Sequence, residues 1–257
     1  MWIDNIPKKT ELAAPECQEH FFRGSDQCVL LLHGYTGSPH DMLFLGKQLH
    51  AAGFSVYIPR LPGHGTNHFD FLNSNYNQWL RKAIDSYLNL NQEFSEVLCC
   101  GLSMGGLLTL LLAALFTPRK IALAAPALKT SNKLIYLTPL IGLFKKKIKR
   151  SNSEKRDEAY LRILQSEYWD YDWPTKAQDL LKLQRLTRAR LPKVYSDCFT
   201  ICSKSDQSVP VEVLDIIENG VSSAKKERLI LEKSPHVVVN DIEKEKVAQE
   251  IIDWFSE

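Results

Sequence analysis

The segment EVLCCGLSMGGLLTLLLAALF, residues 96–116, combines three patterns that decide the fold. Its first part is a short apolar run of the kind found in strands that are buried on both faces. Its last part, Leu107 to Phe116, is almost wholly apolar and long enough for a buried helix. Between them, GLSMG at residues 101–105 matches the pattern Gly-x-Ser-x-Gly, in which the serine occupies a strained strand-to-helix turn. The segment therefore predicts that the hydroxyl of Ser103 projects above a sheet.

The same alternation of short apolar runs and longer amphipathic stretches continues on both sides of this segment. It is typical of βα units that build a mostly parallel sheet. The expected strands are residues 28–34, 55–61, 96–103, 121–127, 197–206 and 227–234. The expected helices are residues 39–52, 76–91, 107–116, 211–219 and 241–255. We therefore expect an α/β fold in which helices flank a mostly parallel central sheet.

The composition changes after Ala127. Residues 129–193 hold sixteen Lys and Arg against seven Asp and Glu, a net charge of +9 in a chain whose total is +2. This region lacks short β-branched runs, and it has helical patterns at residues 159–165 and 177–189. We interpret it as a helical lid inserted into the core. The expected division is a core of residues 1–127 and 193–257 and a lid of residues 128–192.

A serine hydroxyl is a weak nucleophile unless an imidazole takes its proton and a carboxylate orients that imidazole. Of the seven histidines only His236 follows Ser103, and it lies in a turn directly after an expected strand. Asp206 closes the strand expected at residues 197–206, whereas Asp197 begins that strand and would lie at the opposite edge of the sheet. The sequence therefore predicts Ser103, His236 and Asp206 as the catalytic set. Each position also admits a purely structural interpretation, namely a chance Gly-Ser turn, a surface-loop histidine and a turn aspartate.

Acyl transfer further needs N–H donors aimed at the developing oxyanion. In a fold of this kind one donor follows the nucleophile and another lies in the loop after the first strand of the βα series, which here are the backbone N–H groups of Met104 and Tyr35. His236 is the expected general base. His33, in that same loop, and His64, in a glycine-rich turn, are therefore expected to make structural hydrogen bonds.

Charge and cysteine usage exclude several classes of function. With 32 Lys and Arg against 30 Asp and Glu, the chain has no overall field that would recruit nucleic acid. The N-terminal residues have no uninterrupted apolar region of the secretory type, and no run approaches a transmembrane span. The six cysteines resemble buried free thiols of a cytoplasmic protein, and no CxxC pair is present. We therefore expect neither a metal nor another cofactor.

Five motifs in this order, HGYTGS, RLPGHG, GLSMGG, SKSDQSVP and SPHVVVND, make the chain resemble the bacterial carboxylesterase and monoacylglycerol lipase group of α/β-hydrolases. The resemblance spans roughly residues 26–256. It implies the α/β-hydrolase fold, a lid between the sixth and seventh strands at about residues 128–192, and the same site residues. Those are a triad of Ser103, Asp206 and His236 with backbone donors at Tyr35 and Met104.

The expected function is hydrolysis of a small-molecule carboxylic ester, either a short to medium acyl ester or a monoacylglycerol, through an acyl-enzyme on Ser103. A thioesterase, a lysophospholipase, an aromatic-acid esterase or a slow-turnover receptor of the same fold would keep these residues, so these alternatives stay open. The sequence indicates no particular oligomeric state.

Within the expected lid, residues 134–150 join an apolar stretch to five cationic residues. Three interpretations compete: lid packing with a solvated basic tail, an apolar wall for an acyl chain, and contact with a membrane surface. The sequence favours the first of these and ranks membrane contact last.

Overall fold

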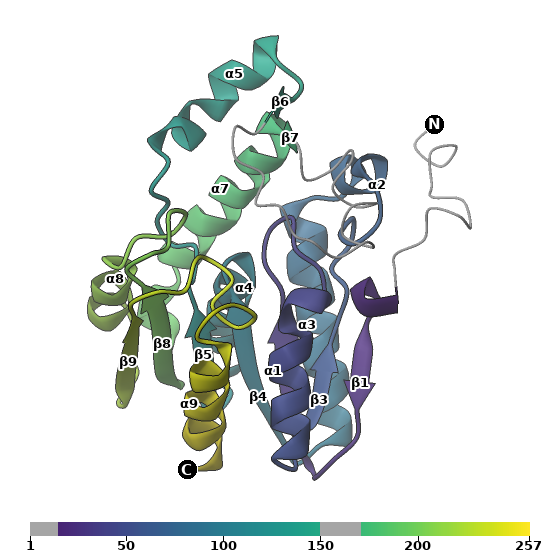
Figure 1. The fold of residues 1–257 in the computed structure, drawn as a ribbon, viewed down its shortest axis with the longest axis vertical. Helices are drawn as coiled ribbons and strands as arrows, with labels where there is room; N and C mark the ends of the chain where they lie inside the picture. The colour runs from purple at the N-terminus through teal and green to yellow at the C-terminus, as the bar shows by residue number, and fades with distance from the viewer. Residues whose placement is uncertain (1–14, 150–170) are drawn as a thin grey trace.

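The computed structural model describes residues 15–149 and 171–257. Within these ranges seven strands form one sheet in the order β1-β3-β2-β4-β5-β8-β9. All neighbouring strands pair in parallel except β1, which pairs antiparallel with β3 (Figure 1). The strands are β1 (His20–Phe22), β2 (Gln27–Leu32), β3 (Ser55–Ile58), β4 (Glu96–Leu102), β5 (Lys120–Ala124), β8 (Asp197–Ser203) and β9 (Lys226–Leu231).

Helices cover both faces of this sheet (Figure 1). One apolar cluster lies under α3, α4, α7 (Pro174–Arg188) and α8, and a second lies under α1 and α9. The adjacent thiols of Cys99 and Cys100 fall in different clusters, as expected for neighbouring residues of a buried strand. The helices of the core are α1 (His40–Ala51), α2 (His68–Asn73), α3 (Tyr76–Glu93), α4 (Met104–Phe116), α8 (Val213–Gly220) and α9 (Lys244–Ser256).

The predicted α/β architecture is confirmed, and all six expected strands are present. Each of them ends one to three residues before its expected last residue, because the chain leaves the sheet there to form loops at its carboxyl edge. The sequence did not predict β1, since three residues at an edge are too few to produce a periodic signal. A short turn, η3 (Pro15–Cys17), precedes β1.

The crossing from β4 to α4 is the most crowded point of the core. A Cβ atom added at Gly105 would lie 2.0 Å from the carbonyl oxygen of Leu32 in β2, and one added at Gly101 would lie 2.2 Å from the carbonyl oxygen of Gly105. Helix α4 therefore touches the sheet backbone directly, with no side chain between them. Residues Met104 to Ala113 are all buried, which explains why this helix is apolar on every side.

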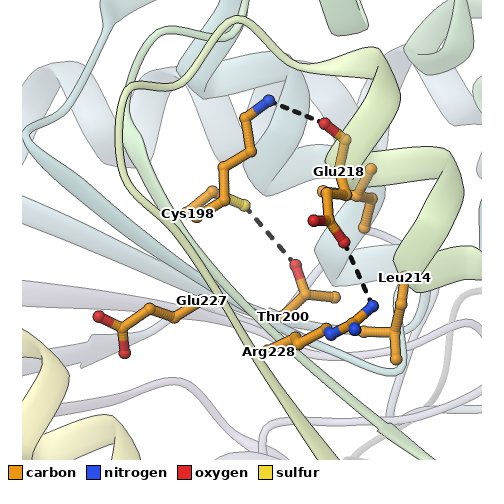
Figure 2. Close-up of a pocket in the computed structure, with 8 residues that line it drawn as sticks. Cys198, Thr200, Leu214, Glu218, Glu227 and Arg228 are labelled. Atoms are coloured by element: carbon orange, nitrogen blue, oxygen red, sulfur yellow. Dashed lines mark hydrogen bonds and ion pairs between the residues drawn. The ribbon is translucent and has the colours of Figure 1, made fainter.

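Helix α8 is held to the edge strand β9 by two cationic side chains. Lys226 Nζ donates to the carbonyl oxygens of Glu218 at 2.7 Å and Val221 at 3.0 Å, and so satisfies the end of the helix. Arg228 donates to the Glu218 carboxylate at 3.3 Å. A crevice of about 90 Å³ lies between the helix and the strand, and Glu218, Lys226 and Arg228 are among the residues that line it (Figure 2). Both cationic side chains therefore already have hydrogen-bond acceptors within the protein.

The segment between β5 and β8 contains η4 (Lys133–Leu137), α5 (Thr138–Phe144), β6 (Ile148–Lys149), β7 (Tyr171–Asp172), α7 (Pro174–Arg188) and η6 (Leu191–Lys193). The described part of this insertion contains the helices α5 and α7, and β6 and β7 add a short antiparallel pair that the sequence did not predict. The insertion follows β5, which is the fifth strand of the described sheet along the chain. The resemblance had implied a lid that follows the sixth strand. The helical pattern at residues 159–165 lies outside the described residues.

Helix α7 is anchored to the core along its length. The buried Lys176 Nζ donates to Asp179 at 2.8 Å and also to the carbonyl oxygen of Ser74 before α3. Further along, Gln184 Nε2 donates to the carbonyl oxygen of Ala127 at 2.7 Å, and Arg188 Nε donates to that of Leu128 at 2.8 Å. The second half of the insertion is therefore held firmly against the core.

Among the described residues, no helix has both the length and the apolar character needed to cross a membrane. The same residues contain no group of three or more His, Cys, Asp or Glu side chains that could hold a metal ion.

We predict that Gly105→Ala lowers the free energy of unfolding by about 3 kcal/mol or more, because the new Cβ has no space against the backbone of β2. Gly53→Ala is the control, since Gly53 has φ +102° but no heavy atom within 4 Å of the new Cβ. It should cost only about 1–2 kcal/mol of backbone strain. Urea unfolding followed by circular dichroism measures both, and equal losses would contradict the crowding argument.

Candidate active site

Ser103 lies at the tip of a tight turn between β4 and α4. Its backbone has φ 55° and ψ −111°, a conformation that costs a non-glycine residue about 1–3 kcal/mol. Its N–H donates to the carbonyl oxygen of Ala124 in β5 at 2.8 Å, and its carbonyl oxygen accepts from Ala127 at 3.1 Å and from Gly106 at 3.0 Å. These bonds hold the strained turn in place, as predicted from the glycine-flanked motif.

The structure brings the three residues of the predicted catalytic set together. Ser103 Oγ lies 2.8 Å from His236 Nε2, and His236 Nδ1 lies 2.7 Å from Asp206 Oδ2. Because Nδ1 faces a carboxylate, it carries the ring proton, and Nε2 is left to accept from the serine hydroxyl. The arrangement is thus set for proton transfer from Ser103 to His236.

Backbone amides fix the orientation of the Asp206 carboxylate. Its Oδ1 accepts from the N–H of Ser208 at 2.7 Å and from that of Val209 at 3.0 Å, which leaves Oδ2 for His236. Asp197 lies at the other end of β8, where its carboxylate accepts from the N–H of Lys225 at 3.3 Å. The choice of Asp206 over Asp197, made from their positions in the strand, therefore agrees with the geometry.

The loop after β2 passes directly beside the serine. Strand register pairs Leu32 with Gly101, and an added Cβ at Gly34 would lie 3.4 Å from Ser103 Cβ. The ring of Tyr35 packs against Phe71 and Trp79, with ring centroids 5.5 Å and 6.2 Å away. Met104 is the first residue of α4, where backbone N–H groups have no acceptor inside the helix. Both predicted donor positions therefore flank Ser103, and their role at the oxyanion remains a prediction.

His33 ties this loop to the loop after β3. Its Nε2 accepts from the N–H of Leu61 at 3.1 Å, so its Nδ1 is protonated and donates to the carbonyl oxygen of Gly34 at 3.0 Å. Burial lowers the pKa of His33 to about 4, so the ring is neutral at physiological pH. Burial likewise lowers the pKa of His64, which contacts the carbonyl oxygen of Pro62 at 3.0 Å. Both histidines have the structural hydrogen bonds that the sequence predicted.

The turn that carries His236 rests on a residue that the sequence did not single out. The carboxylate of Glu243 accepts from the N–H groups of Lys233 at 3.0 Å and Ser234 at 2.9 Å, and from the Ser234 hydroxyl at 3.0 Å. Partial burial opposes the charged form, but these hydrogen bonds outweigh it and lower the pKa of Glu243. No local pattern marks this residue, because its partners lie nine and ten positions away in a loop.

The cysteines do not compete with Ser103 as nucleophiles. All six are unpaired and buried, and burial raises the pKa of both Cys100 and Cys198 to about 12. These thiols are therefore protonated at neutral pH, and the thiolate is the nucleophilic form.

The comparisons with known proteins agree with this site. The model of the alpha/beta hydrolase family matches residues 29–249. The chain is 31% identical over 241 residues to the thermostable monoacylglycerol lipase of Bacillus sp. (strain H-257), covering 89% of this chain and 90% of that one. It is 27% identical over 236 residues to the carboxylesterase of Bacillus subtilis (strain 168), covering 91% of this chain and 94% of that one.

Solved structures of lipolytic enzymes have the same fold as this chain. A chain from a structure described as LipS and LipT, two metagenome-derived lipolytic enzymes, superposes with a TM-score of 0.86 at 27% identity, covering 95% of this chain and 99% of that one. A soluble variant of the monoglyceride lipase of Saccharomyces cerevisiae has the same fold, with a TM-score of 0.75 at 16% identity and 97% coverage of both chains. The resemblance to the bacterial carboxylesterase and monoacylglycerol lipase group is thus confirmed, and the chain belongs to the alpha/beta hydrolase family and has its fold.

Proposed function

We propose that the protein hydrolyses small-molecule carboxylic esters through an acyl-enzyme on Ser103. The observation that carries this proposal is the unbroken line of hydrogen bonds from Ser103 Oγ to His236 Nε2 at 2.8 Å and from His236 Nδ1 to Asp206 Oδ2 at 2.7 Å. The names of its relatives, a monoacylglycerol lipase and a carboxylesterase, support an ester as the substrate.

In the first half of the proposed reaction, Ser103 Oγ attacks the ester carbonyl while His236 Nε2 takes its proton. Asp206 stabilises the resulting imidazolium through the hydrogen bond to Nδ1. The backbone N–H groups of Tyr35 and Met104 receive the oxyanion of the tetrahedral intermediate. The C–O bond to the alcohol then breaks, and the alcohol leaves with the proton from His236.

In the second half, His236 removes a proton from a water molecule, and the hydroxide attacks the acyl carbonyl. The bond to Ser103 Oγ breaks, the carboxylic acid leaves, and His236 returns the proton to the serine. Every proton is exchanged among the serine, the histidine, the leaving alcohol and the attacking water, so the cycle balances and both residues return to their starting states.

We propose short to medium acyl esters or monoacylglycerols as substrates, with residues 128–192 acting as a lid over a core formed by residues 1–127 and 193–257. The similarity to a monoacylglycerol lipase supports the substrate class. The lid is supported by the place at which the chain leaves the sheet, because Ala124 at the end of β5 accepts the backbone N–H of Ser103. A lid that starts there borders the nucleophile.

Ser103→Ala should abolish covalent labelling by a fluorophosphonate probe and lower kcat by about 10⁴-fold or more, because the attacking oxygen is removed. Ser208→Ala is the matched control, since that exposed residue contacts Asp206 through its backbone N–H and would be labelled normally. In-gel fluorescence of the intact protein measures labelling. Labelling of the Ser103→Ala protein at the wild-type rate would refute the acyl-enzyme.

A panel of esters separates the proposed activity from its alternatives. We predict multiple turnovers on monoacylglycerols and on p-nitrophenyl esters of short and medium acids, with kcat/KM at least tenfold above that for thioesters, lysophospholipids and aromatic-acid esters. Product release followed by pH titration gives all these rates on one scale. A preference for one of the other classes would reassign the substrate, and binding without turnover on every ester would indicate a receptor.

A further inference from the structure

Residues 232–240, which follow β9 and carry His236, contain neither helix nor strand. The path of such a segment is set by individual hydrogen bonds, because no ladder of backbone bonds holds it. Two residues before His236, Ser234 is 0% exposed. Its N–H, its carbonyl oxygen and its hydroxyl all have partners outside this turn. The position of His236 therefore depends on the groups that hold Ser234.

Glu243 holds Ser234 from the side of α9. Its Oε2 atom accepts from the N–H of Lys233 at 3.0 Å, from the N–H of Ser234 at 2.9 Å and from the Ser234 hydroxyl at 3.0 Å. The same hydroxyl accepts from the backbone N–H of Glu243 at 3.1 Å. The two residues are therefore joined by hydrogen bonds that run in both directions.

The helix that begins after Glu243 is itself fixed to the sheet. Trp254 Nε1 in α9 donates to the carbonyl oxygen of Ile121 in β5 at 3.1 Å, and the buried Lys120 Nζ donates to the carbonyl oxygen of Trp254 at 2.7 Å. Glu243 therefore extends from a fixed helix to a turn that has no regular structure of its own.

Ser203, the last residue of β8, holds Ser234 from the opposite side. Its buried hydroxyl donates to the carbonyl oxygen of Ser234 at 2.5 Å and accepts from the N–H of Ser205 at 3.2 Å. Ser205 directly precedes Asp206 in the chain. A movement of Ser234 would therefore change the distance between His236 and Asp206.

We propose that Glu243 is a positioning residue, which aligns His236 by holding Ser234 in place. The inference rests on the proposed function, in which His236 exchanges a proton with Ser103. The bonds of the imidazole to Ser103 and Asp206 are 2.8 Å and 2.7 Å long, and a displacement of about 1 Å at a reacting group can cost about 10²-fold in rate. Because Glu243 acts through the turn, its loss should change kcat and leave KM nearly constant.

A purely structural role for Glu243 makes a different prediction. The residue is the N-cap of α9, where a negative charge stabilises a helix. Aspartate is a preferred N-cap residue, so this role predicts a stable and active Glu243→Asp protein. Within the described helix, however, the Glu243 side chain caps none of the first N–H groups, and it reaches Ser234 instead. Positioning needs the full length of the side chain and predicts the opposite result.

The test compares three substitutions in the intact protein. Glu243→Gln keeps the length and an acceptor oxygen, so kcat should stay within threefold of wild type. Glu243→Asp is one carbon–carbon bond shorter and Glu243→Ala has no acceptor, so both should lower kcat at least tenfold while KM stays within about threefold. Hydrolysis of a short p-nitrophenyl ester gives both constants. Glu245→Ala, which removes an exposed carboxylate of the same helix, is the matched control and should leave them unchanged.

A second background shows whether the effect passes through the base. In a His236→Ala protein there is no imidazole to align. Glu243→Asp should then lower the residual kcat less than twofold, because residues that act as a unit have non-additive effects. A tenfold loss that persists without His236 would show that Glu243 acts elsewhere and would overturn the assignment.

The outcome at residue 243 is also decisive by itself. Wild-type kcat in Glu243→Asp, or an equal loss in Glu243→Gln and Glu243→Asp, would overturn the assignment. Urea unfolding checks that each variant is folded. If Glu243→Ala does not fold, the other two variants carry the test, and a Glu243→Asp protein that does not fold would make the role one of stability and would also overturn the assignment.

Proton NMR of the free protein separates this inference from the proposed function. The resonance of the Nδ1 proton between His236 and Asp206 should persist in Glu243→Gln and be lost in Glu243→Asp, and it is measured without substrate. A wild-type protein that hydrolyses no ester and takes no fluorophosphonate label would count against the proposed function. The NMR comparison would still decide whether Glu243 aligns the imidazole, and an unchanged resonance in Glu243→Asp would show that it does not.

Discussion

The backbone turn at Ser103 constrains the rest of the molecule. With φ at 55° between the buried residues 97–102 of β4 and the buried residues 104–113 of α4, the turn survives only because its surroundings leave it no alternative. Strand β5 accepts its N–H, and the first turn of α4 donates back to its carbonyl oxygen. The absence of side chains at Gly101 and Gly105 lets α4 lie on the backbone of β2, which brings the helix start next to the loop at Gly34.

The remaining parts of the site reach Ser103 because parallel strands end at a common edge. Register pairs Ser203 of β8 with Leu231 of β9, so the loops that follow these strands begin at the same level. One loop carries Asp206 and the other carries His236. Their separation is then fixed by hydrogen bonds that cross between the loops, chiefly from Ser203 to Ser234. On the far side His33 connects the loops after β2 and β3 in a similar way.

The sequence predicted the parts of this structure that leave a periodic or positional signal. Parallel strands buried on both faces are continuous apolar runs, and the residues of the predicted catalytic set follow such runs in a characteristic order. Six strands and the meeting of Ser103, Asp206 and His236 could therefore be predicted. The strand β1 and the pair of β6 and β7 could not, because two or three residues carry no period. The sequence did not indicate Glu243 for a different reason. Its hydrogen-bond partners, Lys233 and Ser234, are brought to it by the fold of the loop between β9 and α9.

The hydrogen bond from Ser103 to His236 joins residues 133 positions apart, and the bond from His236 to Asp206 joins residues 30 positions apart. Such long-range contacts form late, because the intervening chain must first be ordered. During synthesis the turn that carries Ser103 emerges well before Asp206 and His236. On the proposed function, a chain still on the ribosome carries an unactivated alcohol, and the line of hydrogen bonds to Ser103 is complete only when the loop after β9 reaches the edge of the sheet.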